Sequence, residues 1–274
     1  MRFSQQSFEV VAALFERTAG IRYPAEKKQT VAMRLMRLAK EHGSQSIDDY
    51  VDAVLGESPD GAEVTRIVDR LTTNETYFFR EPAHFDFLEN LLRERAGGGK
   101  GTAPFRVWSA ASSSGEEAYS IAMVLADRLG LQGNWEVVGT DLSTAMVAAA
   151  RTGLYAMDRI EGIDPTRLRR YCMKGGGPYE GKMLMSRELR GRVRFETANL
   201  MRPLPPALRL GRFDVIFLRN VMIYFDPPGK KEVVERVAGH LAEHGFLFTG
   251  HAESLTGVTW DLAAVQPAVY ERTG

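Results

Sequence analysis

The stretch that decides the fold is residues 105–120, FRVWSAASSSGEEAYS. A short apolar run leads into small residues, then two carboxylates, Glu116 and Glu117, and then a segment with the apolar spacing of a helix. This order predicts a strand, a tight turn and a helix whose N-terminal N–H groups face the strand end. Small residues in the turn would let a ligand approach the backbone closely there.

The two carboxylates indicate which ligand suits this turn. Glu116 and Glu117 would repel a pyrophosphate, whereas a ribose diol or a sulfonium cation suits a carboxylate. The stretch therefore favours a Rossmann-like nucleoside site for S-adenosylmethionine. A doubly wound fold in which both side chains only complement the helix dipole explains the same residues without a ligand.

The composition restricts the class of protein. The chain has 274 residues, with 35 basic and 35 acidic side chains, so no global field draws it to nucleic acid or to an anionic membrane surface. Its single cysteine, Cys172, excludes an internal disulfide and fits a reducing compartment. The chain lacks an apolar run of about 18 residues and a signal-peptide core at its N-terminus. We expect a cytoplasmic protein with no nucleic-acid partner and no membrane insertion.

Residues 1–70 have helical periodicity and predict a small N-terminal helical domain. Within it, residues 27–40 (KKQTVAMRLMRLAK) carry basic side chains and no acidic one. Lys27, Arg34 and Arg37 fall within about a quarter-turn arc at roughly 100° per residue. This basic face either binds an acidic partner or pairs with the acidic segment that follows it, and charge alone favours the second interpretation.

Residues 69–80 (DRLTTNETYFFR) place hydrogen-bonding side chains directly before three aromatic rings and Arg80. This composition is typical of the wall of an adenine or methionine pocket, in which Arg80 would bind a carboxylate. A helix cap followed by a hydrophobic staple is the alternative. The glycine-rich residues 96–104 lack the spacing of a phosphate-binding loop, so we interpret residues 71–104 as a connecting segment.

From residue 105 onward, predicted strands alternate with predicted helices, as in a doubly wound α/β domain covering residues 105–274. Strands expected at 135–141, 193–200 and 213–218 end in polar residues, which are Asp141, Asn199, Arg219 and Asn220. Ligands of open α/β sheets bind outside the carboxyl ends of the strands, so we expect these side chains to converge.

Two further patterns lie outside these strand ends. Residues 174–186 (KGGGPYEGKMLMS) place turn signals between extended runs and predict an antiparallel hairpin inserted at about 155–195. The exposed edge of this hairpin could bind an extended peptide by strand addition. The alternative is an insertion that binds no partner. His240 and His244 have i, i+4 spacing on a helix expected at 230–243, but with no third ligand in the pattern we expect no metal site.

Four separated motifs carry a resemblance to a known family over nearly the whole chain: LTTNETYFFRE, WSAASSSGEEAYSIAM, Asn199-Leu200 and FLRNVMIYF. Together they resemble the CheR-type chemotaxis receptor methyltransferases. The resemblance implies an α/β fold: a Rossmann-like class I methyltransferase sheet with a small N-terminal all-helical domain and an inserted three-stranded antiparallel subdomain. It also implies methyl transfer from S-adenosylmethionine to glutamate side chains on the cytoplasmic helices of chemoreceptors, with S-adenosylhomocysteine as product.

The same resemblance assigns roles to residues. The basic helix with Lys27, Arg34 and Arg37 resembles the part that meets the receptor's methylation helices, which reverses the interpretation from charge alone. The loop GGGPYEG (175–181) resembles that of members which dock a receptor C-terminal pentapeptide. Ala118 stands where the family often has proline, a change compatible with a helix. The positions that match the family's cofactor contacts are Asn74, Thr76, Arg80, Glu117, Asp141, Asn199, Leu200, Arg219 and Asn220.

A glutamate carboxylate is ionised at pH 7, so transfer requires alignment of the reactants rather than a strong base. We expect Arg80 to hold the acceptor carboxylate and the Tyr224 hydroxyl to steer it. The alternatives are a nucleotide-dependent oxidoreductase, which the missing GxGxxG opposes, a non-catalytic receptor-binding module, and a methyltransferase for nucleic acid or a small molecule. No apolar heptad run predicts a coiled coil, and we expect a monomer.

Overall fold

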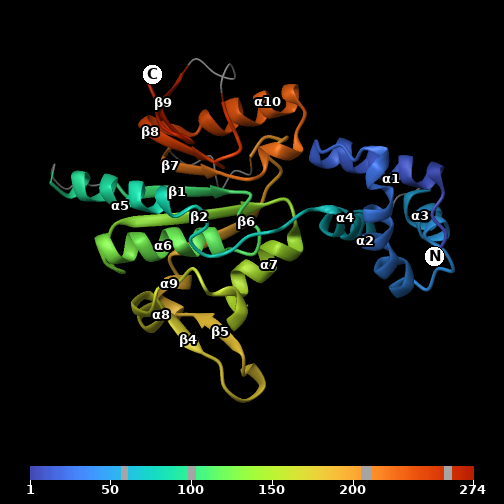
Figure 1. Ribbon diagram of the computed structural model, residues 1–274, viewed down its shortest axis with the longest axis horizontal. Coiled ribbons are helices and arrows are strands. Elements are labelled where there is room, and N and C mark those ends of the chain that lie inside the picture. Colours follow the sequence, from blue (N-terminus) through green and yellow to red (C-terminus); the bar gives the residue numbers. More distant parts are fainter. Residues whose placement is uncertain (57–60, 98–102, 205–211, 256–260) are drawn as a thin grey trace.

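The computed structural model describes residues 1–56, 61–97, 103–204, 212–255 and 261–274. A group of N-terminal helices packs beside a large sheet covered by helices, and a small second sheet extends away from the large one (Figure 1). This arrangement confirms the α/β class with an N-terminal helical part and an inserted antiparallel subdomain.

The N-terminal helices have a core of their own. Ser4 caps the first helix by accepting the N–H of Ser7, and Gly20 ends it in the left-handed region at φ 71°. Apolar side chains one helical turn apart, such as Val31 and Leu35, are fully buried between these helices. The elements are α1 (Gln5–Ala19), η1 (Ala25–Lys27), α2 (Lys28–Glu41), α3 (Ile47–Leu55) and α4 (Gly61–Leu71).

The large sheet has the strand order β6-β2-β1-β7-β8-β10-β9. Its first five strands are parallel, and the last two pair antiparallel at one edge. Continuous apolar runs fit strands that are covered on both faces. The strands are β1 (Phe105–Ala110), β2 (Trp135–Asp141), β6 (Val193–Thr197), β7 (Phe213–Leu218), β8 (Leu241–Thr249), β9 (Leu262–Gln266) and β10 (Val269–Arg272).

Alternate residues of each strand build two separate cores. Val107 packs with the helices on one face, while its neighbour Trp108 packs against the opposite layer. One face is covered by α5 (Pro82–Gly97), α6 (Glu116–Leu129) and α7 (Thr144–Thr152), and the other by α10 (Pro227–Ala238). Both layers leave the carboxyl ends of the parallel strands open toward the N-terminal helices (Figure 1).

The predicted insertion is confirmed as a three-stranded antiparallel sheet of order β3-β5-β4. It leaves the main sheet after α7 and returns before β6, and it projects below α6 in Figure 1. Its elements are β3 (Leu154–Ala156), η2 (Met157–Arg159), α8 (Pro165–Tyr171), β4 (Cys172–Lys174), η3 (Gly177–Tyr179), β5 (Lys182–Met185) and α9 (Arg187–Arg190).

The prediction of a helix at 230–243 is wrong at its C-terminal end. The helix α10 ends at Ala238, Gly239 is its C-cap, and β8 begins at Leu241 because the chain pairs there with β7. His240 and His244 therefore do not share a helix face. His244 lies in β8 at φ 58° with Nδ1 3.1 Å from Glu271.

Most of the glycine-rich run expected as a connector, together with the proline-rich residues before β7, lies outside the described residues. The start of the glycine-rich run belongs to the last turn of α5, which continues to Gly97. Strand β9 was not predicted; it pairs antiparallel with β10 at the edge of the large sheet. Among the described residues, every helix is too short or too polar to cross a membrane.

Candidate functional site

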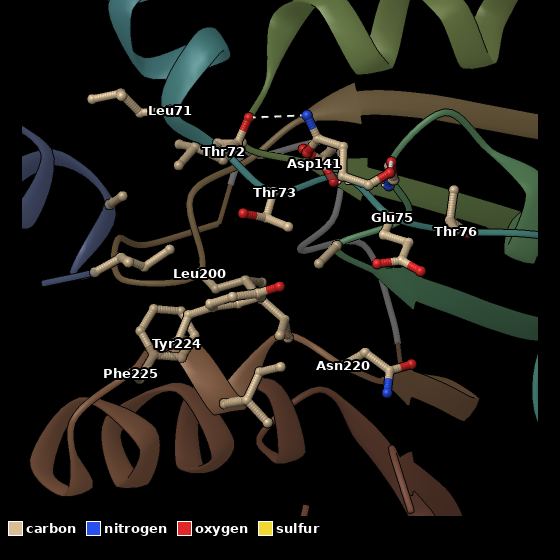
Figure 2. Close-up of a pocket in the computed structure, with 18 of the residues that line it drawn as sticks. Leu71, Thr72, Thr73, Glu75, Thr76, Asp141, Leu200, Asn220, Tyr224 and Phe225 are labelled. Atoms are coloured by element: carbon tan, nitrogen blue, oxygen red, sulfur yellow. Dashed lines mark hydrogen bonds between the residues drawn. The ribbon is translucent and has the colours of Figure 1, made fainter. Parts of the chain in front are cut away.

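A cavity of about 340 Å³ lies where the parallel strands end, a size typical of small-molecule sites. Three parts of the chain line it: the segment from α1 into α2, the connecting segment after α4, and the residues that follow β1, β2, β6 and β7. Figure 2 shows Thr73, Asp141, Asn220 and Tyr224 around this space, although they come from distant parts of the sequence. The cavity is thus formed at the junction of the N-terminal helices with the sheet.

The cavity brings together nearly all of the site residues predicted from the sequence. Every residue that matches the family's cofactor contacts lines it, as do Tyr224, Lys27 and Arg34. Arg37 is outside the lining; its side chain is 71% exposed and pairs with Glu41 one turn further along α2. The cofactor-contact set consists of Asn74, Thr76, Arg80, Glu117, Asp141, Asn199, Leu200, Arg219 and Asn220.

A buried ion pair forms one wall. Glu117, in the first turn of α6, has Oε2 3.1 Å from Arg219 Nη1, and its Oε1 accepts a hydrogen bond of 2.7 Å from Ser109 Oγ. Burial raises the pKa of the Glu117 carboxyl, and the Arg219 guanidinium opposes that rise. A ligand ammonium beside this pair would replace hydration that the carboxylate has lost, so the wall suits a cationic group.

Asp141 ends β2 and connects two turns at the rim of the sheet. Its Oδ2 accepts the backbone N–H of Ser113 at 2.8 Å, and its Oδ1 accepts that of Ser143 at 2.9 Å. Burial raises the pKa of Asp141, and these N–H groups oppose the rise. Two carboxylate oxygens offer about four acceptor positions, so the backbone N–H groups leave capacity for a ribose hydroxyl.

The connecting segment between α4 and α5 is held against the sheet by hydrogen bonds. Asn74 donates to Thr72 Oγ1 at 3.0 Å, the contact drawn as a dashed line in Figure 2, and the Asn74 carbonyl accepts from Ser113 Oγ at 3.0 Å. Arg159 of η2 donates to the Thr76 carbonyl at 2.9 Å. The inserted subdomain therefore also supports this wall of the cavity.

Only one of the three aromatics in the connecting segment lines the cavity. Tyr77 is 49% exposed and lies under the guanidinium of Arg80, 5.5 Å from ring centroid to Cζ. Phe78 is buried against Tyr155, and Phe79 packs on Phe85 instead. The expectation that the aromatic run forms the pocket wall is therefore corrected: two of its rings anchor the segment in the core.

Several non-glycine residues near the cavity have left-handed backbone. The φ angles are 65° for Ala111, 48° for Ser113, 54° for Phe79, 58° for Glu81 and 56° for Asn220. Such conformations cost free energy, and they concentrate where a ligand is bound. The identities of these residues gave no reason to predict a left-handed backbone at their positions.

Arg34 is turned inward, unlike the other basic residues of α2. Its Nη1 donates to the carbonyls of Leu71 and Thr72, the latter at 3.2 Å, and to the Tyr23 hydroxyl at 2.9 Å. Its Nη2 donates to Thr73 Oγ1 at 3.1 Å. Arg34 therefore joins α2 to the connecting segment, whereas Lys27 is exposed at the rim.

The sequence did not predict two carboxylates beside the cavity, the partly buried Glu81 and the buried Glu253. Glu81 lies 3.1 Å from Arg219 Nη2 and so holds the guanidinium from the side opposite Glu117. Glu253 accepts the backbone N–H groups of Asn220 at 2.7 Å and Ile223 at 3.2 Å, which shapes the loop after β7. Glu81 directly follows the predicted Arg80, but no sequence signal points to Glu253.

The comparisons with known proteins match both parts of the chain. The family model described as the CheR methyltransferase SAM binding domain matches residues 74–270, and that described as the CheR methyltransferase all-alpha domain matches residues 6–72. Together with the carboxylates and small residues that line the cavity, the first match identifies the cofactor as S-adenosylmethionine and the chain as a methyltransferase that depends on it.

Relatives that match nearly the whole chain support the same family. The chemotaxis protein methyltransferase of Salmonella typhimurium is 36% identical over 98% of this chain and 91% of its own length. That of Escherichia coli is 38% identical over 93% of this chain and 87% of its own length. Chemotaxis protein methyltransferase 2 of Pseudomonas aeruginosa is 35% identical over 98% of this chain and 93% of its own length. The chain therefore belongs to the CheR methyltransferase family.

Proposed function

We propose that the protein is a protein-glutamate O-methyltransferase that converts glutamate carboxylates on the cytoplasmic helices of bacterial chemoreceptors into methyl esters, for adaptation in chemotaxis. The observation that carries the proposal is the cavity, in which the nine residues that match the family's cofactor contacts converge from separate parts of the sequence. The relatives named as chemotaxis protein methyltransferases support the same function.

Residues of this chain would hold the two ends of the cofactor, which supplies a methyl group on a positively charged sulfur. Glu117 would bind the amino group of its methionine end, because that carboxylate is largely shielded from water beside the Arg219 guanidinium along the cavity wall. Asp141 would accept the ribose hydroxyls. The side chains of Asn199 and Leu200, which follow β6, would complete the nucleoside wall.

Arg80 and Tyr224 would position the acceptor carboxylate. The described contacts of Arg80 use one of its N–H donors, on the Glu75 carbonyl at 3.1 Å, so several of the five remain for a carboxylate. Tyr224 lines the same cavity, where its hydroxyl would donate a second hydrogen bond. Orientation of an ionised carboxylate toward the methyl carbon is the main contribution that such a site can make.

The N-terminal helices would form the receptor contact, as one domain of residues 1–70 joined by residues 71–104 to the methyltransferase domain of residues 105–274. Lys27, the N-cap of α2, and Arg37 on α2 are exposed and basic, and Met33 on α2 is 66% exposed. An exposed apolar side chain between cations fits an amphipathic helix with acidic residues. Arg34 would act on this contact indirectly, because its donors are used inside the protein.

The inserted sheet would dock the receptor's C-terminal pentapeptide. Within the described residues, β4 pairs with β5 on one side only, so its other edge offers backbone groups for strand addition. Met173 on β4 is 47% exposed and Tyr179 in the adjoining loop is 56% exposed, which provides apolar contacts for side chains of the peptide. We further propose that the protein acts as a monomer in the cytoplasm, where the receptor helices are.

The test is methyl transfer from labelled S-adenosylmethionine to a chemoreceptor cytoplasmic fragment, with and without the C-terminal pentapeptide. Base-labile label on the fragment is the expected result, with slower labelling after removal of the tail. Equal labelling of both fragments would support the methyltransferase activity but contradict docking of the pentapeptide. Tight cofactor binding without any labelling would instead favour a non-catalytic receptor-binding module.

A further inference from the structure

A cluster of Glu81, His84 and His251 lies beside Arg219 and outside the cavity lining. Glu81 and His84 flank the start of α5, and His251 follows β8, so the fold unites residues far apart in the sequence. One donor atom from each of the three lies within 4.8 Å of the other two. We propose that these side chains bind a divalent transition-metal ion of the zinc and cobalt class.

Two of the three donor spacings lie close to those around such an ion. Both imidazoles turn Nδ1 toward Glu81 Oε2, at 2.9 Å for His251 and 3.5 Å for His84. Two donors that are each about 2.05 Å from a metal ion lie about 2.9 Å apart at a right angle and about 3.3 Å apart at a tetrahedral angle. Two imidazoles and one carboxylate are also a donor set that proteins use for transition metals.

His84 supplies an independent reason to expect a ligand. The residue is 1% exposed, and neither ring nitrogen has a hydrogen-bond partner in the described part of the chain. A neutral imidazole nitrogen offers a lone pair to a metal ion. A buried ring nitrogen without a partner costs free energy, which a coordinated ion would recover.

The site is accessible and is connected to the cavity. His251 is 53% exposed on its side chain, so an ion can enter from solvent, while His84 is held between the rings of Phe248 and His251. Arg219 Nη2 lies 3.1 Å from the same Glu81 oxygen. A bound ion would share that oxygen with Arg219, which on its other side contacts Glu117 in the cavity wall.

The test is a titration of the tag-free, chelator-treated full chain with Co²⁺, followed by visible absorption, and with Zn²⁺ by equilibrium dialysis. We expect one ion per chain and a visible band when Co²⁺ binds. H251A should weaken both by tenfold or more, because it removes one of three ligands from an exposed position. E81Q should have the same effect, because it removes the anionic ligand.

H244A is the matched control, since His244 is also an exposed histidine with Nδ1 near a glutamate, at 3.1 Å from Glu271, but lies on β8. It should bind as the wild type does. The proposal is overturned if the wild type binds no ion, if H251A and E81Q bind as tightly as the wild type, or if H244A loses binding equally. The readout does not involve methyl transfer, so its failure leaves the proposed function standing.

Discussion

At the scale of single residues, the chemistry of the cavity depends on charges that are kept out of water. Asp141, which is buried, and Glu117, whose side chain is 14% exposed, line it, and Arg219 contacts two carboxylates. Low local polarity strengthens each of these interactions with a bound ligand. Single substitutions at this site therefore act either on ligand affinity or on the step that follows binding.

Tyr224→Phe separates those two effects. Loss of one hydrogen bond to the acceptor carboxylate is worth about 1 kcal/mol, so turnover should fall roughly fivefold. The affinity for S-adenosylhomocysteine, measured by calorimetry, should stay nearly unchanged. Tyr77→Phe is the matched control, because Tyr77 also lines the cavity but is not assigned to the acceptor. Unchanged turnover of Tyr224→Phe would remove this residue from the mechanism.

Glu116 gives a prediction about pH. It is fully buried beside Arg159 at 3.2 Å, and burial raises the pKa of its carboxyl above the unfolded value, which Ser114 and Arg159 oppose. A raised pKa contributes stability that is present below the unfolded pKa and is lost as the pH rises through the folded pKa. Glu116→Gln removes this titration.

The free energy of unfolding of Glu116→Gln minus that of the wild type should therefore be larger at pH 8 than at pH 4.5, so the variant gains stability relative to the wild type as the pH rises. Urea unfolding of both proteins across that range measures it. A difference that does not vary with pH would contradict the assignment of a raised pKa to this carboxyl.

The sequence predicted those site residues that lie at the carboxyl ends of parallel strands, where ligands of such folds bind. Asp141, Asn199 and Arg219 follow parallel strands, and the carboxyl ends of such strands share one edge. Glu253 and His251 follow the parallel strand β8 as well, but the sequence analysis assigned no role to either residue. Their importance comes from loop geometry that brings them to Asn220 and Glu81, and local sequence does not encode such a contact.

At the scale of elements, α2 presents two arginines with different tasks. Arg34 donates to backbone carbonyls of the connecting segment, whereas Arg37, one turn later, pairs only with Glu41 among its described contacts. The basic arc seen in the sequence therefore divides into an inward residue and an outward one. Periodicity places residues on a face but does not say which of them meets a neighbouring segment.

Arg34→Gln should lower the free energy of unfolding by about 2 kcal/mol, since hydrogen bonds to a charged donor are worth about 1.5–3 kcal/mol. It should also weaken binding of S-adenosylhomocysteine, because the connecting segment carries Asn74 and Thr76. Arg37→Gln is the control on the same helix: it should change neither quantity but should slow transfer to the receptor fragment. Equal losses of cofactor affinity in both variants would contradict the different roles assigned to Arg34 and Arg37.

Helix ends were the least predictable feature. Apolar spacing continued past Ala238, so the sequence favoured a helix to residue 243. Pairing of Leu241 with Phe213 draws the chain into β8 instead, and this tertiary contact outweighs the local pattern. The strand–turn–helix at residues 105–129 was predictable because its small-residue turn, the carboxylates in the first turn of its helix and its apolar periodicity all favour the same structure.

At the scale of the molecule, the cavity needs both the N-terminal helices and the sheet. Lining residues come from the end of α1, from α2, and from strand ends in the large sheet. The motifs predicted which residues meet there, but not that Ile21 forms a bridge to Phe225 across the two parts. Such contacts depend on how two folded parts dock, which residue patterns along one chain do not specify.

A ligand in this cavity should therefore stabilise both parts together. At a concentration of about 100 times its dissociation constant, S-adenosylhomocysteine should raise the free energy of unfolding by about 2.7 kcal/mol. Hydrogen exchange should slow in residues 19–34 as well as at the strand ends. Protection at the strand ends alone would contradict a cavity shared between the two parts.

The most direct test of the account is to locate the methyl group. The wild-type chain would be incubated with S-adenosylmethionine and a chemoreceptor cytoplasmic fragment, and the fragment analysed by tandem mass spectrometry before and after mild base. The account predicts methyl esters on glutamate side chains of the receptor helices, removed by the base. Base-stable methylation of lysine or arginine, or an unmodified receptor despite bound cofactor, would contradict it.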